Sequence, residues 1–176
     1  MNFTEQFLIS LMSKRARNTL KLTSVLSHFT LNFDYDFSIY LHHYWQNPQT
    51  VKTEESCCIG GKEMRLKFRP NTVILQEQSV EKRILLTNHV LDTFKKPIIS
   101  LEFSDPTLPS TALEIMKMIN KRQPCIKSFT YHINSPSSEF IPRIMDECTE
   151  VTDSISIYSL FPDDFVYTPS RPFRAD

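Results

Sequence analysis

Apolar residues at the start of the chain recur three or four positions apart, which is the period of an amphipathic helix. This apolar side consists of Phe3, Phe7, Leu8, Leu11 and Met12. Basic residues gather in the later turns, where the helix dipole favours positive charge. Asn2 is a suitable N-cap, and Glu5 follows three residues later, as in a capping box. The pattern predicts one helix that begins near Thr4 and ends near Leu20.

Alternating apolar and polar residues then predict two pairs of antiparallel strands. The first pair covers residues 28–34 and 37–44, which are rich in aromatic and aliphatic residues. The second pair covers residues 64–69 and 72–76 around a proline-asparagine turn. In residues 64–69 apolar and basic side chains alternate, so one face is expected to be buried and the other basic. Residues 47–61 are polar and contain both glycines, which predicts a loop.

The second half of the chain alternates between helix and strand patterns at a nearly constant interval. Ser79 is expected to cap a helix that continues to about Phe94, and Pro97 follows its end. Three short strands of one pattern then begin 28 and 26 residues apart. These strands cover residues 100–103, 128–131 and 154–157.

A helix is predicted between each of these strands and the next. The first, residues 110–121, is expected to begin with a capping box formed by Thr111 and Glu114. The second, residues 138–148, contains Pro142, which a helix tolerates only near its start. Strands joined by single helices are expected to lie parallel, since such crossovers are right-handed and cover one face of the sheet.

These patterns predict an α/β (α+β) fold: an N-terminal helix, antiparallel hairpins, and strand-helix units that form a small parallel sheet. The interval is typical of leucine-rich repeats, although the asparagine and leucine ladder of that family is missing. The predicted divisions are a helix at 1–20, a domain at 21–165 with hairpins in 21–78 and repeats in 79–160, and a loose tail at 166–176. No helix pattern follows the last strand, which would leave an apolar edge uncapped, so we expect the chain to end early.

Composition favours a folded protein of a reducing compartment. Of the 176 residues 40% are hydrophobic, and 20 basic residues balance 20 acidic ones. This balance argues against binding to nucleic acid or to an anionic membrane. No stretch approaches the roughly 20 apolar residues needed to cross a bilayer. The four cysteines lack the spacing of a disulfide framework, so we expect reduced thiols and a location in the cytoplasm and/or nucleus.

Residue types that carry catalysis or bind metals form no recognisable motif. Gly60 and Gly61 are the only glycines, so a phosphate-binding loop is not expected and the pair is predicted to form a plain turn. The histidines at 42–43 and the cysteines at 57–58 are adjacent pairs, and adjacent strand residues point to opposite faces. No serine lies in a nucleophile-elbow motif. The sequence therefore predicts no enzyme activity, no metal and no cofactor.

Surface recognition suits the repeated strands better than catalysis does. Glu102, Thr130 and Ser156 occupy the third position of the three strands and should project from one face. Such positions commonly form the binding surface of a repeat protein, and simple solvent exposure explains them equally well.

The phrase Leu-Met-Ser-Lys-Arg at 11–15, with the strand phrases at 98–103 and 126–133, resembles nematode F-box proteins that carry an F-box-associated domain of type 2. The resemblance implies a non-catalytic receptor: the F-box binds the Skp-type adaptor of a cullin-based ubiquitin ligase, and the associated domain selects a protein substrate. Carried over to this chain, the adaptor-binding candidates are Phe7, Leu8, Leu11, Met12, Lys14 and Arg15. The substrate-recognition candidates are Glu102, Thr130 and Ser156.

The chain departs from that family at its start. The apolar Leu-Pro run and first helices of the F-box do not precede Met1, so adaptor binding is expected to be weak or lost. The alternative is a small intracellular α/β protein with an enzymatic or ligand-binding site near the carboxyl ends of the parallel strands, around Ser104, Asn134 and Ser159. That alternative requires buried histidine and acidic side chains that converge there.

Overall fold

The computed structural model describes residues 1–23, 28–41, 53–122, 124–134 and 139–174. In these ranges the chain forms one eight-stranded mixed sheet with the strand order β3-β4-β5-β2-β1-β6-β7-β8. The strands are β1 (His28–Phe33), β2 (Phe37–Leu41), β3 (Thr53–Ile59), β4 (Lys62–Arg69), β5 (Thr72–Leu75), β6 (Ile98–Phe103), β7 (Cys125–His132) and β8 (Ser154–Tyr158). The helices are α1 (Phe3–Met12), α2 (Lys14–Thr23), α3 (Val80–Thr93), α4 (Pro109–Asn120) and α5 (Ile141–Glu147), with a short 3₁₀ turn η1 (Cys148–Glu150).

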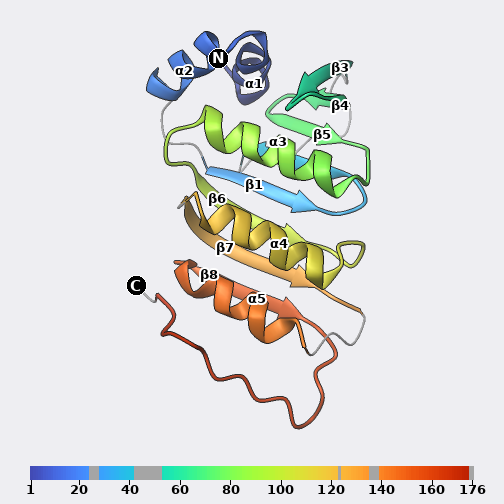
Figure 1. Cartoon of the computed structure of the whole chain (residues 1–176), viewed down its shortest axis with the longest axis vertical. Coiled ribbons are helices and arrows are strands. Elements are labelled where there is room, and N and C mark those ends of the chain that lie inside the picture. Colours follow the sequence, from blue (N-terminus) through green and yellow to red (C-terminus); the bar gives the residue numbers. More distant parts are fainter. Residues whose placement is uncertain (24–27, 42–52, 123, 135–138, 175–176) are drawn as a thin grey trace.

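The mixed α/β fold predicted from the sequence is confirmed. Strands β1, β6, β7 and β8 are parallel neighbours, whereas β1–β2, β2–β5, β5–β4 and β4–β3 are antiparallel. Helices α3, α4 and α5 each lead into the next parallel strand, and all three lie on one side of the sheet (Figure 1). The predicted repeat therefore exists, and β1 of the first hairpin is its first parallel strand.

Aromatic side chains join the antiparallel and parallel halves into one core. Phe33 of β1 stacks on Phe37 of β2 at 4.5 Å and on Phe103 of β6 at 4.6 Å between ring centroids. All three rings are fully buried. Burying a ring of this size contributes about 1.5 to 3 kcal/mol relative to exposing it, so this row stabilises the centre of the sheet.

The prediction of one long N-terminal helix is wrong, because the chain forms two helices that meet at Ser13. Ser13 is extended, with φ −165° and ψ 160°. Its hydroxyl accepts a hydrogen bond from the backbone N–H of Ala16 at 3.0 Å, which caps the start of α2. Serine competes in this way for backbone donors, and here the cap replaces helical continuity. The predicted capping box of Asn2 and Glu5 is confirmed.

The prediction of a loop over residues 47–61 is wrong for its second half, because residues Thr53–Ile59 form β3. The strand is polar because it lies at the edge of the sheet and most of its residues are exposed on both faces. Gly60 and Gly61, with φ of 59° and 79°, connect it to β4 in a plain two-residue turn, as predicted. Residues 42–44 of the predicted strand and 47–52 of the predicted loop lie outside the described residues.

Two further boundaries differ from the sequence prediction. Helix α4 begins at Pro109 with Leu108 as its N-cap and no side-chain cap, so the predicted capping box at Thr111 is wrong. Proline suits the first helical position because its missing N–H would have no partner there. Helix α5 begins at Ile141 and not at residue 138, so Pro142 lies in its first turn, where proline was predicted to be tolerated.

The segment after β8 has no helix or strand, as predicted, but it is held against the helix layer. Phe165 and Phe173 pack against the core, and the N–H of Arg174 donates to the carbonyl of Thr149 at 3.0 Å. The segment thus covers apolar surface beside α5 that the sequence predicted to be uncapped. Residues 166–174 are therefore not the loose tail that the sequence predicted.

Candidate functional site

The first helix is anchored on the antiparallel half of the sheet. The N–H of Phe3 donates to Oδ1 of Asn71 at 3.1 Å, and the hydroxyl of Thr4 donates to the carbonyl of Arg69 at 2.7 Å. Asn71 has a φ of 59° in the turn between β4 and β5, a conformation that asparagine tolerates better than most residues. This turn therefore fixes where α1 begins.

Phe7 was predicted to contact an adaptor, and the structure places it in the core instead. Its side chain is fully buried, with its ring 6.1 Å from Phe68 of β4 and 5.5 Å from the ring of His89. A side chain with no exposed surface cannot contact a partner of the folded chain. Phe7 is therefore removed from the candidate adaptor-binding residues.

The other five candidates form an exposed corner where α1 meets α2. We call Leu8, Leu11, Met12, Lys14 and Arg15 the N-terminal corner. Met12 is 78% exposed, Lys14 and Arg15 are exposed, and Leu8 and Leu11 are half-buried against the core. The extended Ser13 turns the chain between Met12 and Lys14, so apolar and basic groups are presented close together.

Ser10 and His89 form a buried pair that the sequence analysis missed. Oγ of Ser10 lies 2.7 Å from Nε2 of His89, and Ser10 also donates to the carbonyl of Phe7. A hydroxyl has one proton, so Nε2 of His89 must donate to Ser10. A catalytic dyad needs the opposite polarity, in which histidine accepts the serine proton. Ser10 is also fully buried, so its hydroxyl is closed to a substrate and the pair joins α1 to α3.

The three substrate-recognition candidates lie side by side, as predicted. Glu102 pairs with Thr130, and Thr130 pairs with Ser156, in the parallel registers of β6, β7 and β8. All three side chains are half-exposed and alternate along β6 and β7 with fully buried core residues. They therefore project from the sheet face opposite that core, which we call the open face. On the adjacent strands the same row continues to Asn32 and Ser38.

Hydrogen bonds between side chains order the open face. The hydroxyl of Tyr40 on β2 donates to Oε2 of Glu102 at 3.1 Å and so reaches across β1. Burial raises the pKa of Tyr40 to about 12, with further contributions from the charge of Glu102 and from this hydrogen bond. Ser128 donates to Ser100 at 2.7 Å, and Ser100 lies 2.8 Å from Nε2 of His28. The face therefore presents short polar groups in fixed positions.

The carboxyl ends of the parallel strands show a different arrangement from the one that the alternative function requires. The N–H of Ser104 donates to Phe33, and the N–H of Asn134 donates to Asp105 at 2.9 Å. Ser159 has a buried hydroxyl without a hydrogen-bond partner. The described histidine nearest this edge, His132, is exposed and stacks on Tyr158 at 4.4 Å. Within the described ranges, buried histidine and acidic groups do not converge there.

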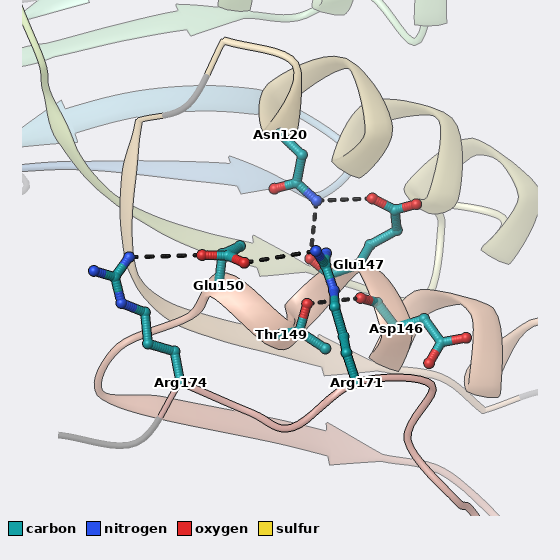
Figure 2. Close-up of polar contacts among 7 residues, drawn as sticks. All are labelled: Asn120, Asp146, Glu147, Thr149, Glu150, Arg171 and Arg174. Carbon is teal, nitrogen blue, oxygen red and sulfur yellow. Dashed lines mark hydrogen bonds and ion pairs between the residues drawn. The ribbon is translucent and has the colours of Figure 1, made fainter.

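A pocket lies instead near the amino ends of these strands, between α4, η1 and the C-terminal segment. Its volume is about 820 Å³, and its wall includes Lys96 and Cys125. Five of the residues drawn in Figure 2 also line it: Asn120, Glu147, Glu150, Arg171 and Arg174. Glu150 lies between Arg171 and Arg174, at 3.6 Å from each guanidinium. Asn120 donates to the carbonyl of Glu147 at 2.9 Å and to its carboxylate at 2.8 Å. Acidic and basic groups thus pair with one another around this opening.

Asp146 is expected to hold the C-terminal segment in place. Its Oδ1 accepts from the N–H of Ser170 at 3.2 Å and from the hydroxyl of Tyr167 at 2.9 Å. The hydrogen bond from the N–H of Ser170, and then that from Tyr167, lower the pKa of Asp146. At a pH above the ordinary pKa of aspartate, the ionised carboxylate therefore stabilises the docked segment. This stabilisation is lost as the pH falls through the lowered pKa and the carboxylate takes up a proton.

We expect Asp146→Ala to speed amide hydrogen exchange of residues 165–174 several-fold. Asp164→Ala removes the same charge at another position and should leave this exchange unchanged. Equal exchange in the two variants would contradict this assignment.

Among the described residues, no group of three or more histidine, cysteine or acidic side chains is arranged to hold a metal ion. None of the described helices is long and apolar enough to cross a membrane. Comparison of the chain with protein-family models, with curated proteins and with solved structures finds no match.

Proposed function

We propose that the chain is a non-catalytic protein-interaction module, an F-box-type substrate receptor or a relative of one, in a cullin-based ubiquitin ligase. In this proposal the N-terminal corner contacts a Skp-type adaptor and the open face contacts a protein substrate. The resemblance of residues 11–15 to nematode F-box proteins motivates the first part. The module would act in the cytoplasm and/or nucleus.

The exposure of the N-terminal corner is the observation that carries the proposal. Phe3 and Phe7 anchor α1 in the core, and Met12 is nevertheless 78% exposed beside exposed Lys14 and Arg15. A large apolar side chain next to basic groups suits a partner with an apolar pocket and an acidic rim. The phrase that resembles the F-box therefore lies where a partner can reach it.

The same geometry makes the proposed adaptor contact weak. Phe7 is unavailable, and Leu8 and Leu11 bury part of their surface against the core of the chain itself. Met12 is left as the main apolar contact, supported by charges that are exposed to solvent. Exposed charge pairs contribute about 0 to 1 kcal/mol each and are screened by salt, so they add little affinity.

The open face supports the second part of the proposal. Glu102, Thr130 and Ser156 lie in one row whose side chains are half-exposed, and Tyr40 holds Glu102 in place. Polar groups at regular spacing on a sheet suit the recognition of a protein surface. Such recognition needs no catalytic side chain.

Titration of the chain with a purified Skp-type adaptor tests the proposal. We expect weak binding that added salt weakens further and that Lys14→Glu with Arg15→Glu also weakens. The matched control, Lys117→Glu with Lys121→Glu on the exposed side of α4, changes the net charge equally and should bind like the parent chain. Equal binding by both double variants would contradict the role of the corner, as would no detectable binding by the parent chain. Stoichiometric co-elution that resists salt would contradict weak binding.

A further inference from the structure

The two edge strands of the sheet differ in how they are protected against pairing. The exposed edge strand β3 has acidic residues at Glu54 and Glu55. The opposite edge strand, β8, has none, and the chain carries no charged residue from Ser154 to Pro162. Natural sheets usually protect an exposed edge with charges, proline or a bulge, because unpaired backbone groups bind other strands. The edge at β8 is thus open to pairing.

The hydrogen bonds of β8 show which backbone groups face outward. The carbonyl of Tyr158 accepts from the N–H of Ile133 beyond β7, so the backbone of Tyr158 faces into the sheet. Backbone groups of successive strand residues face opposite neighbours, so those of Ile155 and Ile157 face the outer edge. In the described part of the chain the strand order ends at β8, so no described strand pairs with this edge.

We propose that β8 pairs in antiparallel fashion with β8 of a second copy of this chain, about a two-fold axis at Ser156. This proposal concerns self-association and goes beyond the proposed function. In this register Ile155 of one copy opposes Ile157 of the other, and these residues exchange both backbone hydrogen bonds. Ser156 opposes its own copy as a non-hydrogen-bonded pair, and Ser154 opposes Tyr158.

The sequence of β8 favours a second copy over an unrelated strand. Ser-Ile-Ser-Ile-Tyr reads almost the same in both directions about Ser156, which a two-fold antiparallel pair requires. In this register isoleucine lies opposite isoleucine, serine lies opposite serine at the axis, and no like charges meet. Exposed apolar residues lie at the end of the strand and just beyond it, with Tyr158 56% and Leu160 75% exposed, and a second copy can cover part of them.

The C-terminal segment does not pair with this edge in the described structure. Its polar contacts are with α5 and η1, through Asp146, Thr149 and Glu150. Residues 167–174 therefore lie with the helices, and among the described residues no backbone hydrogen bond joins the segment to the outer edge of β8. Five residues of strand make a small contact, so the dimer is weak and its population depends on concentration.

Sedimentation equilibrium over a range of concentrations tests the proposal. The parent chain should show a monomer-dimer equilibrium, and Ser156→Lys should raise the dissociation constant by at least about fivefold, because two lysines then face each other across the axis. Ser156→Glu should do the same, and an equimolar mixture of the two variants should recover dimers. Ser154→Lys is the matched control: it adds the same charge to the same strand but opposes Tyr158, so its dissociation constant should stay near that of the parent.

Three outcomes would overturn the proposal: a parent chain that remains monomeric at every soluble concentration, equal weakening by Ser154→Lys and Ser156→Lys, or a mixture that stays monomeric. Far-ultraviolet circular dichroism and thermal unfolding establish that each variant is folded. If Ser156→Lys unfolds the chain, the comparison of Ser156→Glu with Ser154→Glu decides the question in the same way. None of these measurements contains an adaptor, so their result is independent of the test of the proposed function.

Discussion

Replacing Phe7 with alanine is expected to lower the free energy of unfolding by about 3 to 5 kcal/mol. The ring is fully buried and lies against Phe3, Phe68 and His89, which belong to α1, β4 and α3. Removing it leaves a cavity where these three elements meet, and neighbours that are themselves large and well packed cannot collapse into it. Urea unfolding followed by circular dichroism measures the loss.

Met12→Ala is the matched control on the same helix. Met12 is 78% exposed, so its truncation should change the free energy of unfolding by no more than about 0.5 kcal/mol. In the adaptor titration, by contrast, Met12→Ala should weaken binding. A Phe7→Ala variant as stable as the parent chain would show that Phe7 is not a core residue and would return it to the candidate interface.

The sequence could not separate Phe7 from Met12, because both belong to the same apolar side of one helical pattern. Which part of that side is buried depends on Phe68 and His89, which lie more than sixty residues away along the chain. The break at Ser13 is equally hidden, since Ser-Lys-Arg is compatible with a continuous helix. Here a local hydrogen bond from Ala16, and not the period of apolar residues, decides the structure.

The parallel strands were predictable because their pattern recurs. The third positions of β6, β7 and β8 fall in one row, since equivalent residues of repeated units occupy equivalent registers. β3 was not predictable in this way, because its residues are polar on both faces and resemble a loop. Its pairing with β4 follows from the two-glycine turn and from an ion pair between Glu54 and Lys67 at 3.0 Å.

The pair formed by Ser10 and His89 was missed because its members are 79 residues apart. Each left a weak signal: Ser10 is a polar residue on the apolar side of a helix, and His89 lies within an apolar stretch. Such signals become informative only when the fold brings two of them together. The buried contact with Ser10 gives His89 a structural role.

Acidification is expected to destabilise the chain through His89. Burial, and then the positive charge of Arg17, lower the pKa of His89 from its ordinary value of 6.5 to about 4, while Asp92 opposes the change. Above the unfolded pKa, His89 is neutral in both states and its contribution to stability is fully present. As the pH falls from about 6.5 to about 4, the unfolded chain takes up a proton that the folded chain does not. The free energy of unfolding should therefore fall by about 3 kcal/mol across this window.

Urea unfolding of the parent chain and of His89→Gln at several pH values isolates this contribution. Glutamine keeps an amide donor for Ser10 but does not titrate, so the variant should be less stable than the parent at pH 7 and should lose less stability on acidification. Carboxylates titrate in both chains, and their contribution cancels in the difference between the two curves. Arg17→Gln should give an intermediate slope, since removing this positive charge moves the pKa of His89 back towards its ordinary value. Parallel curves for the parent chain and His89→Gln would show that burial of His89 does not exclude the proton.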